Sequence, residues 1–225
     1  MTMRVGVVQF PGTNCELDVL RVIELLGGEA ELLFHAEATV SDVDAVVVPG
    51  GFAHGDYLRA GAIARFSPVM TAVAEHAEAG GPVIGICNGF QVLCEAGLLP
   101  GALQKNAGLK FLCEPVDLRV ETTNTVLTNQ ASEGQVLRIP INHFEGNYVC
   151  DDRTLDALRA EERVVVRYVR NPNGALDDIA GVCNEGRNVV GLMPHPERAS
   201  DRLLGSDDGL VMLRSLLASV SVVAR

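Results

Sequence analysis

The sequence predicts an α/β fold: an open, mostly parallel sheet with helices on both faces and extra β-strands in the second half. Two observations in the first half support this prediction. Short runs are apolar throughout, as in strands buried on both faces, and segments with helical spacing separate them. In the second half, shorter strand-like runs alternate with turn residues. We expect residues 1–225 to form a single domain.

The first half alternates strands and helices. Gly27 and Gly28 end the first helical segment, as glycine does after many helices. The predicted strands are RVGVVQF (4–10), AELLF (30–34), DAVVVPGGF (44–52) and VIGI (83–86), and the predicted helices cover 15–26, 68–79 and 88–96. Strands in this order with helices between them favour parallel pairing.

The second half contains mostly strand-like segments. These are FLCEPVDLRVE, QVLRIPINHF, GNYVC, ERVVVRYV, IAGVCN and the start of NVVGLMPHPER. A final helix is predicted from Gly209 to Val220. We expect these strands to fold back onto the same sheet.

Composition and charge exclude several classes of protein. The net charge is −11, and Lys105 and Lys110 are the only lysines, so we expect no nucleic-acid or anionic membrane partner. No apolar run approaches the roughly 18 residues that a membrane span needs, and the first residues read as a strand rather than a signal peptide, so we expect a cytoplasmic protein. The six cysteines form no C-x-x-C motif, and we expect neither disulfides nor a metal site.

The stretch VIGICNGFQVL places Cys87 between a predicted strand and a predicted helix. Gly85 and Gly89 lie two residues away on each side, and glycine relieves crowding where a backbone bends sharply. On such an elbow the side chain projects at the carboxyl end of the sheet. The amino end of the next helix there favours a thiolate, the form that attacks carbon. Cysteine is more often a buried packing residue, but this setting indicates a nucleophile.

A cysteine nucleophile needs a base that a third group orients. Among the five histidines, His195 is distinguished by the segment GLMPHPER, in which Glu197 follows two residues later. Residues at this spacing share a face of an extended chain, and Pro194 and Pro196 hold the backbone extended. Glu197 can therefore hold one imidazole nitrogen while the other faces a sulfur in a surface cleft. The alternative is a surface loop whose prolines only end a strand.

A glycine turn follows another predicted strand, in the segment VVVPGGF. Open α/β sheets bind ligands at this edge, and glycine lets backbone N–H groups approach a substrate closely. The N–H groups of Gly51 and Asn88 could bind a developing oxyanion, and one such donor contributes about 2.7–4 kcal/mol. The alternative is that Gly50 and Gly51 only turn the chain. His54 and His143 lie in predicted glycine-containing loops and have no role assigned from these patterns alone.

Together, GICNGFQ, PGGF and PHPE resemble the class I glutamine amidotransferases, in which glycine turn, cysteine elbow and His-Pro-Glu occur in the same order. Four longer segments are similar to the glutaminase subunits of phosphoribosylformylglycinamidine synthases: FPGTNCELD, GGFAHGDYLRAGAIAR, NHFEGNY and GLMPHPER. The resemblance extends from Val5 to about Leu217. It implies a flavodoxin-like fold and a role in de novo purine biosynthesis.

The resemblance implies a role for each matching residue. Cys87 corresponds to the nucleophile, His195 to the base and later acid, and Glu197 to the orienting carboxylate. The residues implied in oxyanion or substrate binding are Gly50, Gly51, Asn88, Gln91 and His143. Attack on the side-chain amide of L-glutamine would release ammonia and leave a thioester, which water hydrolyses to glutamate.

A partner is also implied. Synthases of this kind use ATP, but the chain has no G-x-x-x-x-G-K-[ST] phosphate loop. We therefore expect a large ATP-dependent synthetase that uses the ammonia to make formylglycinamidine ribonucleotide from formylglycinamide ribonucleotide, and a small third subunit. ATP and magnesium are expected on that partner, with no cofactor on this chain. The predicted contact segment is HGDYLRAG, with Asp56, Tyr57 and Arg59.

Other interpretations stay open. Cys15 begins a predicted helix and is a rival thiol, although packing is the favoured interpretation. A hydrolase or redox sensor resembling the DJ-1 group would share the elbow cysteine, but that group is not marked by His-Pro-Glu. The chain could also be the glutaminase of another synthetase or a non-catalytic binding subunit. It departs from the usual family pattern at His54 and on both sides of His143.

Overall fold

A large mixed sheet forms the centre of the protein. The structure is a computed structural model that describes residues 2–40 and 42–223, with side chains as far as residue 219. In spatial order the strands are β2 (Glu29–Phe34), β1 (Arg4–Gln9), β3 (Ala45–Val48), β4 (Val83–Ile86), β11 (Val189–Leu192), β10 (Ile179–Cys183), β9 (Val164–Tyr168), β6 (Leu112–Val120) and β7 (Val136–His143).

The two halves of the sheet differ as the sequence predicts. Strands β2, β1, β3, β4 and β11 pair in parallel, whereas β10, β9, β6 and β7 pair with antiparallel neighbours. The second half of the chain therefore does extend the first sheet, and the predicted fold class is confirmed. One predicted strand differs: the GNYVC segment supplies β8 (Asn147–Val149), which pairs with β5 (Ala102–Gln104) in a separate small sheet.

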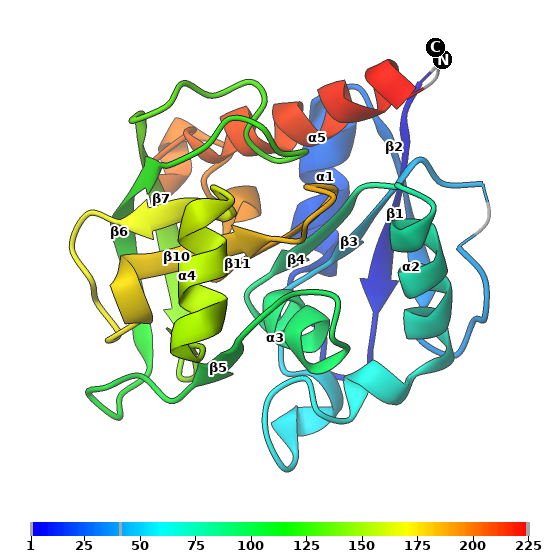
Figure 1. Cartoon of the computed structure of the whole chain (residues 1–225). Helices are drawn as coiled ribbons and strands as arrows, with labels where there is room; N and C mark the ends of the chain where they lie inside the picture. Colours follow the sequence, from blue (N-terminus) through cyan, green and yellow to red (C-terminus); the bar gives the residue numbers. More distant parts are fainter. Residues whose placement is uncertain (1, 41, 224–225) are drawn as a thin grey trace.

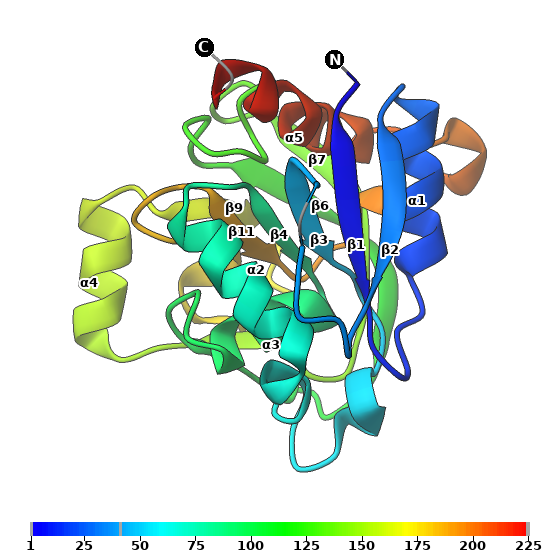
Figure 2. The ribbon, with the colours of Figure 1, turned by 90° about the vertical axis from the view of Figure 1, so that its right-hand side faces the viewer.

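Helices cover both faces of the sheet. Strands β3, β4 and β11 are buried along their whole length, which explains why these runs are apolar throughout. The helices are α1 (Glu16–Leu25), α2 (Pro68–Glu78), α3 (Asn88–Glu95), α4 (Asp152–Ala160) and α5 (Gly209–Val223). Figure 2 shows α1 on one side of the strands and α2 and α3 on the other. No helix among the described residues is long and apolar enough to cross a membrane.

Helix α4 was not predicted from the sequence. Its segment DRTLDALRA is strongly polar, and only Leu155 and Leu158 are buried, so it lacks a broad apolar stripe. Its beginning is nevertheless fixed locally, because the Asp151 carboxylate accepts a hydrogen bond of 2.7 Å from the backbone N–H of Thr154. A capping residue therefore marks the start of this mostly polar helix.

Three parallel strands bring the candidate site together. Strand β4 lies between β3 and β11, and all three run in the same direction. The residues that follow their carboxyl ends are Gly50 after β3, Cys87 after β4 and His195 after β11. Residues far apart in sequence therefore meet at one edge of the sheet, in the lower part of Figure 1.

Candidate active site

Cys87 occupies the elbow between β4 and α3. Its backbone has φ 51° and ψ −107°, a conformation that costs a residue with a side chain about 1–3 kcal/mol. The surrounding structure holds the elbow, because the Cys87 N–H donates a hydrogen bond of 2.8 Å to the carbonyl of Leu192. The predicted strand-to-helix elbow is therefore present, with its side chain directed to the carboxyl edge of the sheet.

The two flanking glycines allow close packing around this elbow. A Cβ atom at Gly89 would lie 1.8 Å from the carbonyl oxygen of Val48 in β3. One at Gly85 would lie 2.6 Å from Leu93 Cδ1 and 2.8 Å from the carbonyl of Gly89. Glycine at these positions lets α3 lie directly against β3 and β4.

His195 and Glu197 form a buried pair. The Nδ1 atom of His195 lies 2.6 Å from Oε1 of Glu197. Only 1% of His195 and 2% of Glu197 are exposed, so the pair is much more enclosed than the surface cleft expected from the sequence. The pairing itself, at a spacing of two residues between two prolines, matches the sequence prediction. Because Nδ1 is on Glu197, Nε2 is the ring nitrogen left for a reaction partner.

The pKa of His195 lies well above its usual value. Burial opposes the charged ring, but the negative charges of Glu197 and Cys87 outweigh it, and the contact with Cys15 acts in the same direction, whereas Nε2 has no hydrogen-bond partner among the described residues. His195 is thus placed where it can carry a proton beside Cys87. His195 and Glu197 are paired at the spacing that the sequence indicates, and His195 lies close enough to Cys87 for the two charges to interact.

Gly50 and Gly51 form the turn that follows β3. A Cβ atom at Gly50 would lie 2.7 Å from His195 Cε1, so the glycine backbone packs against the imidazole edge. Gly51 lines the same pocket as Cys87. Asn88 is the first residue of α3, where backbone N–H groups have no partner within the helix. The two backbone groups predicted to bind an oxyanion therefore flank the cysteine.

A small pocket opens over Cys87. It has a volume of about 160 Å³ and is lined by Gly51, Phe52, Asp56, Cys87, Gln91, Asn142, His143, Phe144 and Glu145. The Cys87 Sγ lies 3.6 Å from the carbonyl oxygen of Asn142. Sequence reasoning did not assign Phe52, Asn142, Phe144 or Glu145 to the pocket wall. The last three belong to the segment NHFEGNY. This segment contributed to the family resemblance, but its sequence does not show that it lies next to the cysteine.

Asn88 and Gln91 connect the pocket walls. The Asn88 amide accepts a hydrogen bond of 2.9 Å from the Ala53 N–H and donates to Asp56 Oδ1 at 3.1 Å and to Gln91 Oε1 at 2.8 Å. The Gln91 amide in turn donates to the carbonyl oxygen of Glu145. Gln91 therefore lines the pocket, as expected for a substrate contact, and it also ties α3 to the opposite wall.

His143 is a neutral histidine beside the pocket. It is the last residue of β7, at the end of the predicted strand QVLRIPINHF rather than in the loop that follows. Its Nδ1 lies 3.1 Å from Asn106 Oδ1, which can only accept, so Nδ1 carries the hydrogen and Nε2 is an acceptor. Burial and the nearby positive charge of His195 lower the pKa of His143 to about 4. The ring is therefore uncharged at neutral pH.

The predicted contact loop divides into two parts. Asp56 faces the pocket, and Arg59 forms a two-pronged ion pair with Glu95 on α3, with distances of 2.5 and 2.6 Å. Tyr57 and Leu58 are instead 73% and 91% exposed. Asp56 thus belongs to the pocket wall, whereas Arg59, whose side chain is 62% exposed, lies at the surface with Tyr57 and Leu58, where another protein can meet them.

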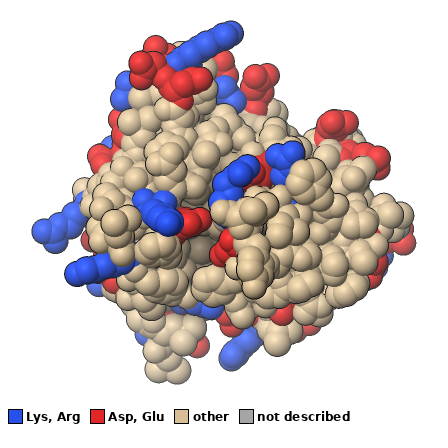
Figure 3. Space-filling view, turned by 90° about the horizontal axis from the view of Figure 1, so that it is seen from below, with Lys and Arg blue, Asp and Glu red and all other residues tan. Residues whose placement is uncertain are grey.

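The surface at this end of the molecule carries no continuous charged patch. Figure 3 views it from below, and the few Lys, Arg, Asp and Glu side chains are interspersed among other residues. Phe52 and Phe66 are also exposed on the elements that follow β3, at 49% and 74%. This face therefore offers apolar side chains rather than a strong electrostatic field.

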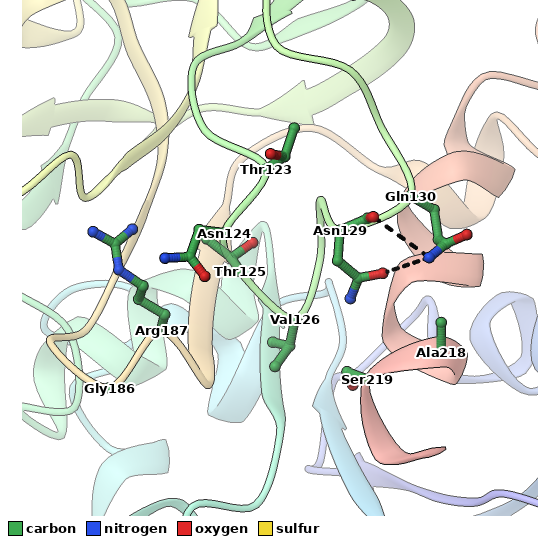
Figure 4. Close-up of a pocket in the computed structure, with 10 residues that line it drawn as sticks. All are labelled: Thr123, Asn124, Thr125, Val126, Asn129, Gln130, Gly186, Arg187, Ala218 and Ser219. Atoms are coloured by element: carbon green, nitrogen blue, oxygen red, sulfur yellow. Dashed lines mark hydrogen bonds between the residues drawn. The ribbon is translucent and has the colours of Figure 1, made fainter. Parts of the chain in front are cut away.

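A larger cavity lies at the opposite edge of the sheet. It has a volume of about 390 Å³ and is lined by Thr123, Asn124, Thr125, Val126, Asn129, Gln130, Gly186, Arg187, Ala218 and Ser219 (Figure 4). Arg187 comes just before the start of β11, whereas Cys87 follows the end of the parallel strand β4. Among the described residues its lining has no cysteine, histidine or carboxylate, so no general base accompanies its serine and threonine hydroxyls.

The fold and the site together define a class of protein. A doubly wound sheet carries an elbow cysteine, and a buried histidine–carboxylate pair lies beside it at the carboxyl edge. This arrangement is that of cysteine-dependent enzymes that transfer or hydrolyse acyl groups.

Comparisons with known proteins narrow this class. A family model described as the CobB/CobQ-like glutamine amidotransferase domain matches residues 2–207. A protein from Rubrobacter xylanophilus named phosphoribosylformylglycinamidine synthase subunit PurQ is 59% identical, covering 98% of this chain and 100% of its own. One of the same name from Salinibacter ruber is 52% identical over 100% of both chains. The chain belongs to the glutamine amidotransferase family and, within it, to the PurQ subunits.

Solved structures agree with this assignment. A chain in the structure of PurLQS from Thermotoga maritima is 43% identical, with a TM-score of 0.90 over 98% of this chain and 100% of that one. A glutamine amidotransferase from the same organism is only 17% identical, with a TM-score of 0.64 over 98% of each chain. The second likeness indicates a shared fold and no more.

Proposed function

We propose that the chain hydrolyses L-glutamine to glutamate and ammonia, with Cys87 as nucleophile, His195 as base and acid, and Glu197 as the orienting carboxylate. The observation that carries the proposal is the buried His195–Glu197 pair, 2.6 Å apart, beside an elbow cysteine that lines a pocket. The similarity to PurQ proteins along nearly the whole chain supports the same reaction.

The first half of the proposed reaction forms a thioester. The Cys87 thiolate attacks the side-chain amide carbon of glutamine, and the carbonyl oxygen becomes an oxyanion that the N–H groups of Gly51 and Asn88 bind. His195, protonated in the ion pair with the thiolate, gives its Nε2 proton to the leaving nitrogen. The carbon–nitrogen bond breaks, ammonia leaves, and the glutamyl group stays on the sulfur.

The second half releases glutamate. His195 is now neutral and accepts a proton from water through Nε2 as the water attacks the thioester carbon. The carbon–sulfur bond breaks, the thiolate is restored and His195 is again protonated. Throughout, the Glu197 carboxylate keeps Nδ1 protonated and compensates the positive charge on the ring.

The ammonia is delivered to a partner. The PurQ relatives are named as subunits of phosphoribosylformylglycinamidine synthase, and the Thermotoga relative was solved as PurLQS. We propose that this chain serves an ATP-dependent synthetase that makes formylglycinamidine ribonucleotide, in the cytoplasm, with a small third subunit in the complex. ATP and magnesium would bind to the synthetase. The exposed residues Tyr57 and Leu58 would contact that partner beside the cysteine pocket.

The other functions considered from the sequence fit less well. A redox sensor or hydrolase of the DJ-1 type does not need a buried His–Glu pair, and that pair is present here. Service to a different synthetase is disfavoured because the similarity to PurQ proteins extends along nearly the whole chain. A non-catalytic binding subunit would not require the thiol of Cys87, the imidazole of His195 and the carboxylate of Glu197 to lie near one another.

Covalent labelling tests the proposed nucleophile. The protein, alone and with its synthetase, is treated with a diazoketone analogue of glutamine, and the adduct is located by mass spectrometry. We expect the adduct on Cys87, and we expect excess glutamine to prevent it. An adduct on Cys15, or none with the synthetase present, would refute the assignment. Glutamate release by the complex, absent in Cys87→Ala, tests the reaction itself.

A further inference from the structure

Cys15 lies on the Nδ1 side of His195. Its side chain is 2% exposed, and its Sγ is 3.9 Å from Nδ1 of His195. On the other side, Nη2 of Arg198 donates to the same sulfur at 3.2 Å. Arg198 also reaches back to α1, with its Nε 3.5 Å from Oδ2 of Asp18. The thiol therefore links the start of α1 to the loop that carries the histidine, although the reaction itself does not use it.

The backbone of the same segment holds the glycine turn. The N–H groups of Asn14 and Cys15 both donate to the carbonyl of Gly50, at 3.1 and 3.2 Å. A Cβ atom at Gly50 would lie 3.1 Å from Cys15 Sγ as well as 2.7 Å from His195 Cε1. The Gly50 backbone and the Cys15 sulfur thus both lie against the imidazole of His195.

The three polar groups at this point form one buried cluster. Ligand-type atoms of Cys15, His195 and Glu197 all lie within 4.8 Å of one another. Oε2 of Glu197 is buried and, among the described residues, has no hydrogen-bond partner, so Oε1 alone fixes the ring. A metal ion would have to compete with the 2.6 Å bond between Nδ1 and Oε1 and with the guanidinium next to the sulfur. The contacts therefore favour an internal support of the histidine.

We propose that Cys15, held by Arg198, is a positioning residue for His195. It encloses the Nδ1 side of the ring, so that Nδ1 stays on Glu197 and Nε2 is presented to Cys87. This inference rests on the proposed function and gives the segment FPGTNCELD a physical role in it. The backbone of that segment holds the oxyanion turn, and its thiol holds the base.

The replacement Cys15→Ala tests the proposal, with Cys183→Ala as a matched control. Cys183 is also buried, and its Sγ makes one polar contact, with the carbonyl of Arg163 at 3.7 Å, but it lies in β10. Two kinds of measurement are made on the full chain with its synthetase. The first gives kcat and KM for glutamine hydrolysis, and the second gives the rate at which iodoacetamide alkylates Cys87 between pH 5 and pH 9, read by mass spectrometry.

Cys15→Ala should lower kcat about 10-fold or more with KM within about twofold, because misplacing a reacting group affects the chemical step. The pH dependence of Cys87 alkylation should shift, and Cys15→Ser should recover part of kcat. Cys183→Ala should change neither quantity by more than about twofold. Equal behaviour of the two alanine variants would reduce Cys15 to a packing residue and overturn the proposal.

A second variant keeps the proposal testable if Cys15→Ala does not fold. Arg198→Met removes the group that holds the Cys15 sulfur. It should shift the pH profile of Cys87 alkylation in the same direction as Cys15→Ala does, by a smaller amount. An unchanged profile in folded Arg198→Met would overturn the role of Arg198. If the wild-type complex hydrolyses no glutamine, the proposed function fails, whereas the alkylation profiles still decide whether Cys15 positions His195 beside Cys87.

Discussion

Nδ1 of His195 and Oε1 of Glu197 lie 2.6 Å apart in an enclosed site. The two residues are separated by one proline, and the chain between them forms the start of a single short turn, Pro196–Arg198. Local backbone geometry therefore fixes the pair, while the sheet brings it to Cys87. This division explains why the three-residue motif His-Pro-Glu can specify two of the three residues of the proposed catalytic group.

Replacing Glu197 with glutamine should lower glutaminase kcat by about 100-fold or more, because the ring loses the charge that stabilises its protonated form. The pKa of His195, now raised well above its usual value, should fall. Titration of the imidazole resonances by NMR measures this change directly. Turnover equal to that of the wild type would remove Glu197 from the mechanism.

Because the His195–Glu197 pair is buried, Glu197→Gln should also lower the stability of the protein, which it would not do in a surface cleft. A glutamine side chain introduces an amide N–H₂ group where Oε2 now lies without a described partner. We expect the free energy of unfolding to fall by about 1–3 kcal/mol, measured by urea denaturation at neutral pH. A fully folded Glu197→Gln protein at 25 °C then separates the loss of turnover from a loss of structure.

The sequence predicted the local parts of the site better than their surroundings. The elbow at Cys87 and the pair His195–Glu197 depend on neighbouring residues, so glycine, proline and residue spacing were enough. The proposed positioning of His195 by Cys15 depends on a contact between residues 180 positions apart. A local sequence pattern cannot predict such a contact. The same limit applies to Asn142, whose carbonyl meets Cys87 only because the last strands fold back onto the first sheet.

The fold shows a similar division. Strands buried on both faces, such as β3 and β4, were recognisable because every residue is apolar. Helix α4 was missed because only two leucines face the core. Strand β8 was recognised as a strand, but its pairing with β5 outside the main sheet depends on tertiary contacts.

Replacing Gly89 with alanine should destabilise the protein although alanine favours helices by about 1 kcal/mol over glycine. The new Cβ would lie 1.8 Å from the Val48 carbonyl, and backbone cannot move aside as a flexible side chain can. We expect the free energy of unfolding to fall by about 3 kcal/mol in urea denaturation. Gly108→Ala is the control, because its Cβ would meet nothing within 4 Å. Equal stability of the two variants would contradict the close packing of α3 on β3.

Replacing Leu58 with aspartate should weaken binding to the synthetase. Leu58 is 91% exposed beside the cysteine pocket, and an interface that covers it would have to bury the new charge. We expect the dissociation constant of the complex to rise about 10-fold or more, measured by analytical ultracentrifugation. Leu203→Asp is the control, because Leu203 is 93% exposed on a short turn after the His195 loop. A larger effect at Leu203 would move the interface away from the HGDYLRAG segment.

Replacing Asp56 with asparagine should raise stability at high pH and not at low pH. Burial raises the pKa of this half-buried carboxyl to about 6, against the hydrogen bond from Asn88, and the charge of Glu145 adds to the rise. Because the folded state holds the proton more tightly than the unfolded chain, the carboxyl favours folding below about pH 4, and this contribution is lost as pH rises through about 6. Asparagine removes the buried charge and keeps an oxygen for Asn88, so the variant's advantage in Tm should grow between about pH 4 and about pH 6 and persist above, measured by calorimetry. Asp156→Asn, exposed on α4, should show no such pH-dependent gain, and a gain of the same size there would assign the effect to net charge instead.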